Sequence, residues 1–296
     1  SAEWYYGPQK WQMHSLQVNY VKSTSLFDAA RLVIGYQNYE ESRHNRNFGS
    51  TNLNNRFEQV LAWSANLDLD KMLSDKIQLF YGAEFITNTV NSSAFQLNIN
   101  TESISPLSTR YPADSDWRSL AAYLSMKYKL NKAMLFTLSS RFTHISTDAT
   151  FDKTFFDFPF DRAEVKNNQL TYSIGTVYSR EETLKVLFNF STGFRAPNVD
   201  DIGKVFDSQP GNVVVPNPTL KPEVAYNFEI GAAFNINKKI KLDGGLYYTF
   251  MRDAISRAPF LFNGQDSINF DGTLSRVLAL QNINSLYVYG VQVGLD

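Results

Sequence analysis

The feature that most limits the fold of this chain is a long alternation of apolar with small or polar residues. Even positions from Val224 to Ile236 are apolar or aromatic, whereas the odd positions between them are Ala, Asn, Glu and Gly. Side chains of a strand alternate between its two faces, so such a run predicts an extended strand with one apolar face. Similar runs occupy 120–130, 136–142 and 184–190.

The length of these runs favours a membrane strand. A soluble β-sandwich, such as a lectin-like one, also alternates, but its strands typically have about five or six residues. The run from Val224 to Ile236 is longer than that, and a membrane strand needs about 9 to 11 residues.

The spacing of the runs predicts strands near 10–21, 26–38, 55–69, 76–90, 116–130, 133–147, 167–179, 184–193, 223–236, 240–252 and 276–296. Their connections alternate between short turns, as at 131–132, and long loops, as at 39–54 and 193–222. Tight turns at one end and long loops at the other are typical of an outer-membrane barrel. We therefore predict an all-β fold, a transmembrane antiparallel up-and-down β-barrel, with 1–296 as a segment of one domain.

Composition agrees with this prediction and excludes several classes of protein. The chain has 23 Phe, 16 Tyr and 4 Trp, and Tyr20, Tyr128, Tyr178 and Phe234 lie just before predicted short turns, where an aromatic girdle is expected. The absence of Cys excludes disulfides and thiol chemistry. The net charge of −1 gives no electrostatic case for a nucleic-acid partner. Catalytic, metal and cofactor motifs are missing, so we expect neither an enzyme nor a bound cofactor.

Two predicted external loops carry candidate ligand-binding residues. In the first, Arg43 and Arg46 could grip a carboxylate or a ferric chelate while His44 ligates metal; the simpler interpretation is a solvated charged loop. In the second, Phe155, Phe156 and Phe158 belong to a Phe-rich segment at 151–160 that either contacts a ligand or packs on neighbouring loops. The pair Asp200 and Asp201 could collect calcium, although such pairs are usually only solvated.

Three boxes in the second half of the chain resemble the TonB-dependent outer-membrane receptor family. The first is Phe194-Arg195-Ala196-Pro197 at a predicted strand end. The second, after a long loop, contains Asn217, Pro218, Leu220, Lys221, Pro222 and Glu223, and the third contains Asn227, Glu229 and Gly231 in the next strand. Pro197 and Pro222 end strand pairing because proline has no amide hydrogen to donate, and Arg195 and Glu223 at opposite ends of the loop could pair at the barrel rim.

The resemblance implies a barrel of about 22 strands around a plug domain, of which this chain would supply about 11. It implies an outer-membrane location in a Gram-negative bacterium and coupling through the absent plug to the TonB, ExbB and ExbD complex. Glu84, Arg141 and Glu229 fall on polar strand faces, where the family's lumen wall meets the plug.

The expected function is active import of a scarce ligand, with a ferric siderophore as the default because it is the family's commonest cargo. Haem, cobalamin, or glycans taken up with a surface lipoprotein are alternatives. The family's haem receptors carry a His between the first two boxes, and this chain has none there. A passive porin or adhesin-like barrel is the rival from a different class.

Overall fold

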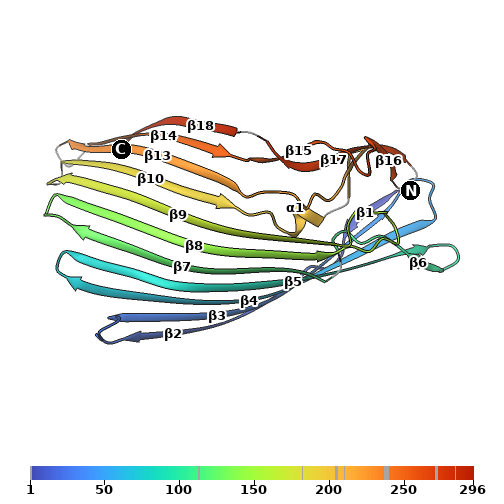
Figure 1. Cartoon of the computed structure of the whole chain (residues 1–296), viewed down its shortest axis with the longest axis horizontal. Helices are drawn as coiled ribbons and strands as arrows, with labels where there is room; N and C mark the ends of the chain where they lie inside the picture. The colour runs from blue at the N-terminus through green and yellow to red at the C-terminus, as the bar shows by residue number, and fades with distance from the viewer. Residues whose placement is uncertain are drawn as a thin grey trace.

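The computed structural model describes residues 2–112, 114–181, 183–203, 206–209, 211–236, 240–270, 273–283 and 285–296, without the side chains of 206–209. Its main feature is one antiparallel sheet of 13 strands whose path runs β1-β3-β4-β5-β7-β8-β9-β10-β13-β14-β18, with β2 paired to β3 and β6 to β5. The long strands lie side by side and meander up and down (Figure 1). In the described part of the chain β2 and β18 do not pair, so the barrel is open between them.

The strands of the main sheet are β1 (Glu3–Tyr6), β2 (Lys10–Val21), β3 (Ala29–Arg46), β4 (Asn52–Ser74), β5 (Ile77–Asn98), β6 (Ile104–Pro106), β7 (Ser115–Lys129), β8 (Met134–Thr150), β9 (Arg162–Arg180), β10 (Leu184–Arg195), β13 (Glu223–Ile236), β14 (Ile240–Arg252) and β18 (Ser285–Leu295). Ten of the eleven predicted strands are confirmed as β2, β3, β4, β5, β7, β8, β9, β10, β13 and β14.

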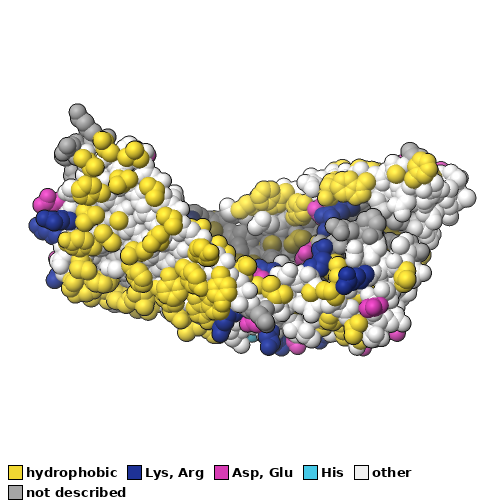
Figure 2. All heavy atoms as spheres, turned by 90° about the horizontal axis from the view of Figure 1, so that it is seen from above, with side chains coloured by type: hydrophobic (Ala, Val, Ile, Leu, Met, Phe, Trp, Pro, Cys, Tyr) yellow, Lys and Arg dark blue, Asp and Glu magenta, His cyan; other side chains and the backbone are white. Residues whose placement is uncertain are grey.

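Strand register places the apolar alternation on one continuous face. Phe188 of β10 lies opposite Ile230 of β13, Ile230 lies opposite Leu246 of β14, and Leu246 lies opposite Val291 of β18. These side chains are exposed, which costs little only where the surrounding medium is lipid. Figure 2 shows hydrophobic side chains gathered over the half of the molecule that carries the short turns.

Several strands extend beyond their apolar runs, and here the predicted boundaries are wrong. We predicted a loop over 39–54, but β3 continues to Arg46 and β4 begins at Asn52. We also predicted one strand over 276–296, but it divides into β17 (Thr273–Asn282) and β18. Above the membrane neither face of a hairpin meets lipid, so backbone pairing continues while the alternation that marks a strand is lost.

The long connections gather at one end of the sheet and fold into a cap. A second sheet of five strands there has the order β11-β12-β17-β15, with β16 beside β17. Its strands are β11 (Phe206–Gln209), β12 (Asn212–Val214), β15 (Ile255–Pro259), β16 (Ser267–Phe270) and β17, and the helix α1 (Val199–Gly203) precedes it. Short connections lie at the opposite end, except that 237–239 falls outside the described residues.

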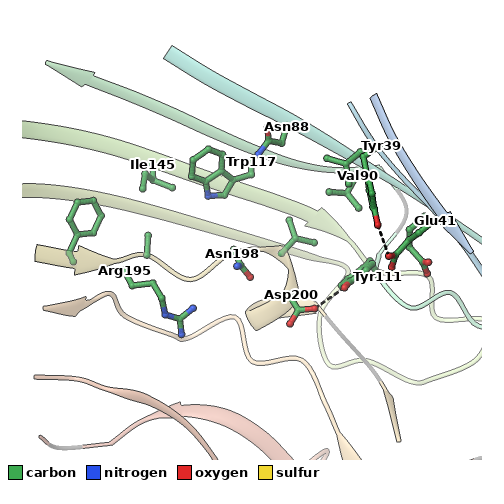
Figure 3. Close-up of a pocket in the computed structure, with 15 residues that line it drawn as sticks. Tyr39, Glu41, Asn88, Val90, Tyr111, Trp117, Ile145, Arg195, Asn198 and Asp200 are labelled. Atoms are coloured by element: carbon green, nitrogen blue, oxygen red, sulfur yellow. Dashed lines mark hydrogen bonds between the residues drawn. The ribbon is translucent and has the colours of Figure 1, made fainter. Parts of the chain in front are cut away.

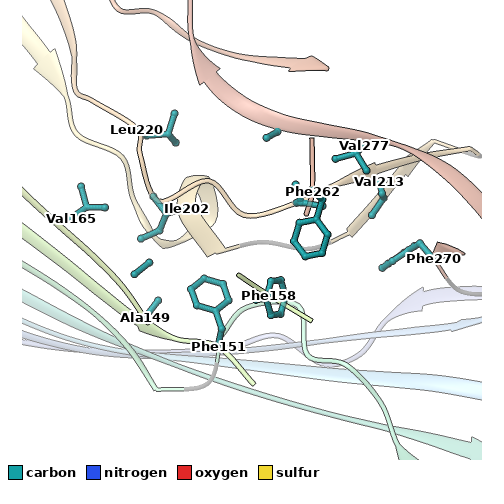
Figure 4. Close-up of a cluster of buried hydrophobic side chains, with 13 residues drawn as sticks. Ala149, Phe151, Phe158, Val165, Ile202, Val213, Leu220, Phe262, Phe270 and Val277 are labelled. Atoms are coloured by element: carbon teal, nitrogen blue, oxygen red, sulfur yellow. The ribbon is translucent and has the colours of Figure 1, made fainter. Parts of the chain in front are cut away.

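The buried core belongs to this cap. A cluster of apolar side chains joins the end of β8 and the start of β9 to three separate connections (Figure 4): Ala149, Phe151, Phe158, Ala163, Val165, Ile202, Val213, Val215, Leu220, Phe262, Phe270, Val277 and Ala279. No helix among the described residues has the length and apolar character that crossing a membrane requires.

Candidate functional site: a chamber under the inward-folded loops

A chamber of about 630 Å³ lies between the sheet and two connections that fold over it. One wall consists of side chains from β3, β4, β5, β7 and β8 (Figure 3). The other contains Tyr111, from the connection before β7, and the segment from Phe194 to Asp200, which includes the end of β10 and the start of α1. Trp63 on the apolar face lies opposite Thr87 of β5, and Thr87 lies opposite Arg118 of β7. The apolar face, which we call the apolar belt, therefore ends near this level. The chamber lies at this edge and above it, toward the long connections.

Hydrogen bonds of its first turn fix the position of α1. The Asn198 side-chain oxygen accepts from the Asp201 backbone N–H at 2.9 Å, while the Asp201 carboxylate accepts from the Asn198 N–H at 3.0 Å. This reciprocal pattern satisfies backbone donors that a helix start leaves free. The helix therefore begins two residues after Pro197, beside the chamber.

Arg195 connects this helix to the rim of the sheet. Its Nε donates to Glu223 at 2.8 Å and its terminal nitrogen donates to Asp201 at 2.6 Å. Arg195 and Glu223 also face each other in the register of β10 and β13, and Glu223 accepts the backbone N–H of Ile255. The predicted rim pair is thus present, and it gathers three connections around one guanidinium.

A hydrogen bond joins the two inward-folded connections beside the chamber. The Tyr111 hydroxyl donates to the Asp200 carboxylate at 2.8 Å, and Figure 3 shows the two side chains pointing toward each other. Burial, with Asp200 beside it, raises the pKa of Tyr111 well above its ordinary value. Nearby, a β-carbon at Gly203 would meet Pro112 at 2.8 Å, so glycine allows the connections to approach closely.

Two carboxylates lie at one end of the chamber. Glu41 of β3 and Glu58 of β4 are directly opposite in register. Glu41 is compensated, because it accepts from the Tyr39 hydroxyl at 3.1 Å, from Arg43 at 3.0 Å and from Arg110 at 3.4 Å. Glu58 is 4% exposed, and burial raises its pKa.

Within the described ranges, no three His, Asp or Glu side chains converge so as to hold a metal ion.

A family model for the TonB-dependent receptor β-barrel matches residues 1–296, the whole chain. The chain belongs to the TonB-dependent receptor family. The assignment agrees with the sheet, whose antiparallel strands have one polar and one apolar face.

Solved structures show the same receptor fold at low sequence identity. The chain is similar to the copper transporter OprC, with a TM-score of 0.77 and 11% identity over 98% of this chain and 44% of that one. It is also similar to the hemophore receptor HasR of Serratia marcescens, solved with its hemophore HasA and heme, with a TM-score of 0.70 and 12% identity over 97% and 46%. The chain therefore spans less than half of these relatives.

A curated relative matches a shorter stretch. The probable hemoglobin and hemoglobin-haptoglobin-binding protein 4 of Haemophilus influenzae is 37% identical over 65 residues, which is 22% of this chain and 6% of that protein.

The second receptor box is held by the cap. The Asn217 side chain donates to the backbone carbonyl of Leu280 in β17 at 2.8 Å and accepts from the Thr219 N–H at 3.1 Å. Asn282 accepts from the Lys221 N–H at 2.9 Å, and Leu220 is buried in the cap core. The box thus fastens the chain that enters β13 to β17, which is distant in sequence.

The structure does not bring Arg43, His44 and Arg46 together. They lie on β3, where the Arg43 side chain lies on the same face as Glu41 while His44 and Arg46 lie on the opposite face. Both ring nitrogens of His44 have partners, Asn55 at 2.7 Å and Ser42 at 3.0 Å, and its ring stacks on Tyr5. The expected charged loop is instead a paired strand.

The Phe-rich segment forms part of the cap core. Phe158 is 6% exposed and its ring centroid lies 5.1 Å from that of Phe151 and 5.9 Å from that of Phe262. Phe156 is partly buried against the same cluster, whereas Phe155 is exposed. The sequence left two interpretations open for this segment, ligand contact and packing on neighbouring loops. The burial of Phe158 favours loop packing.

The polar residues Glu84, Arg141 and Glu229 lie on the face opposite the apolar belt. Arg141 forms an ion pair with Glu84, and Glu229 accepts from Asn227 at 2.9 Å. No motif in the sequence singles out Glu58, Tyr111 or Trp117 as chamber residues. Only the inner-face position of Glu58 in β4 was detectable, and that position is shared by every second residue of the strand.

Proposed function

We propose that the full-length receptor imports a scarce ligand across the outer membrane of a Gram-negative bacterium, with energy from the TonB, ExbB and ExbD complex. A ferric siderophore is the first cargo to test. The observation that carries the proposal is the chamber, which inward-folded loops cover in part on the polar face of a sheet that matches the receptor family throughout. A concave site with an apolar wall and a few polar groups is typical of small-ligand recognition.

We further propose roles for individual residues at the loops, at the plug-facing wall and at the outer surface. Arg195, Tyr111 and Asp200 hold the loops that cover the ligand, and Arg43 supports the acidic end through Glu41. Glu84, Arg141 and Glu229 face the plug, where the pair between Glu84 and Arg141 presents little net charge. Among the external Phe residues, Phe155 remains available to a ligand.

Haem is the second candidate, because of the short stretch of identity to a hemoglobin-binding protein. The three His of the chain lie at positions 14, 44 and 144. In register these pair with residues of the apolar face or its continuation, such as Tyr36 for His14 and Leu120 for His144. The side chains therefore point away from the chamber, and the structure gives more support to a cargo that needs no axial His from this segment.

The test is growth of a strain that lacks the gene, on ferric siderophores, haem or cobalamin as the limiting nutrient, with and without a functional TonB. We expect one nutrient to support growth only when both the receptor and TonB are present. Uptake that persists without TonB would favour the passive porin, and glycan uptake that needs a surface lipoprotein would identify that partner. Loss of surface attachment alone would favour an adhesin.

A further inference from the structure

Glu58 is a buried carboxyl group that makes no hydrogen bond with the described residues. Its side chain is 96% buried, and neither carboxylate oxygen has a hydrogen-bond partner in the described parts of the chain. A buried carboxylate without a partner is costly, so proteins usually pair it or bind something to it. The neighbouring Glu41 is no substitute, since Tyr39, Arg43 and Arg110 already satisfy its oxygens.

The next strand repeats the same condition. Ser92 of β5 lies opposite Glu58 in register, and its buried hydroxyl also lacks a partner among the described residues. The two unpartnered groups lie on the same side of adjacent strands, and Glu58 lines the acidic end of the chamber. The place therefore offers a carboxylate and a hydroxyl to one donor group of a ligand.

Part of the remaining wall is apolar, although Asn88, Asn198 and Asp200 also line the chamber. Val60 of β4 lies two residues after Glu58 and opposite Val90 of β5. Figure 3 shows Val90, Trp117 of β7 and Ile145 of β8 along this wall. A ligand that fills such a space would place an apolar or aromatic body against Trp117 and a donor group at Glu58. Arg110, Arg43 and Arg56 act on Glu58 through their charge, while Arg43 and Arg110 form ion pairs with Glu41.

We propose that the chamber selects cargo with a protonated amine beside an apolar body, with the ammonium group bound by Glu58 and the body packed against Trp117. This assignment rests on the proposed import function and narrows its substrate class. An iron chelate that carries a free amine would fit both the proposed import function and the proposed amine selectivity. A wholly anionic chelate would bring no positive charge to the Glu58 carboxylate.

The test uses the full-length protein in detergent and three probes that differ in one group: 2-(2-naphthyl)ethylamine, 2-(2-naphthyl)ethanol and 2-naphthylacetate. Isothermal titration calorimetry should show the amine bound about tenfold or more tightly than the alcohol, because a hydrogen bond to a charged group contributes more than a neutral one. The acetate should bind most weakly.

Variants locate the effect. Glu58→Gln should remove the preference for the amine, while Glu58→Asp, which keeps the charge on a shorter side chain, should retain part of it. The matched control is Glu40→Gln, because Glu40 lies beside Glu41 in β3 on the opposite face, exposed and paired with Lys10; it should bind the probes like the wild type. If Glu58→Gln does not fold, the Glu58→Asp series still tests the proposal.

An equal affinity for all three probes in the wild type would overturn the proposal, as would an amine preference that survives in Glu58→Gln. The first result is expected if a basic side chain from elsewhere in the full-length protein occupies Glu58. Failure of the proposed import function is a separate outcome. Amine selectivity can be present in a protein whose uptake does not need TonB. Conversely, TonB-dependent uptake of an anionic chelate can occur without amine selectivity.

Discussion

Replacement of Arg195 by Ala should loosen the connections that cover the chamber while leaving the sheet intact. The guanidinium donates to Asp201 in α1 at 2.6 Å and to Glu223 at the start of β13 at 2.8 Å. Its removal leaves two largely buried carboxylates next to each other without their shared cation. The sheet below keeps its backbone ladder, because the substitution lies at the last residue of β10.

The magnitude follows from these two bonds. A hydrogen bond to a charged group contributes about 1.5 to 3 kcal/mol, and solvent screening reduces this at Arg195, whose side chain is 44% exposed. After that discount we expect a loss of about 2 kcal/mol from the free energy that holds α1 in place, which corresponds to about 30-fold more frequent opening.

Hydrogen–deuterium exchange of the full-length protein, read by mass spectrometry, measures this opening directly. Amides of 198–203 should exchange about 30-fold faster in Arg195→Ala, and Arg195→Lys should fall between the two because one ammonium group cannot reproduce the two-sided contact. Peptides from β7 serve as the internal control. Unchanged exchange at 198–203, or an equal increase in β7, would refute the reasoning.

The remaining predictions concern the cap and the two ends of the sheet. Phe158→Ala should cost the cap about 3 to 5 kcal/mol, because it empties space in a packed aromatic cluster; exchange in the cap peptides should rise strongly, and Phe155→Ala, at an exposed position, should change it far less. Tyr111→Phe should free the connection before β7 and speed both association and dissociation of any chamber ligand about tenfold, as measured by stopped-flow fluorescence; rates that match the wild type would show that the bond to Asp200 does not control access. At the opposite end, hydrogen bonds from Lys71, Ser23 and the Met72 backbone lower the pKa of Asp28 to about 2 from 3.8. The stabilisation by its carboxylate should therefore be complete above pH 3.8 and be lost as pH falls toward 2, so the difference in unfolding free energy between wild type and Asp28→Asn should shrink over that range, and a difference independent of pH would contradict the assignment.

The face of each membrane strand could be predicted from the sequence, and the reason is geometric. Side chains alternate with period two in a pleated strand, so Phe188, Ile230 and Leu246 had to share a face once their strands paired in register. The alternation is strong there because lipid meets one face and the lumen meets the other. Receptor boxes were equally visible, since they depend on consecutive residues such as Phe194 to Pro197.

Strand ends and loop contacts were not predictable in the same way. Around His44 both faces of the hairpin are polar, so no period marked the continuation of β3, and the segment resembled a loop. The fate of the Phe residues was equally hidden, because Phe158 is buried by Phe262, which lies in a connection more than a hundred residues later in the chain.

Alternation, connection lengths and boxes thus indicated a receptor barrel, because each is a local pattern imposed by lipid, water and the backbone. Tertiary structure alone decided the chamber. Tyr111 and Asp200 are 89 residues apart, and Glu58 becomes a buried carboxyl group without a hydrogen bond to the described residues only when the connections fold over the sheet. Burial and pairing of a polar group depend on which distant segment covers it, and that information is absent from any local sequence period.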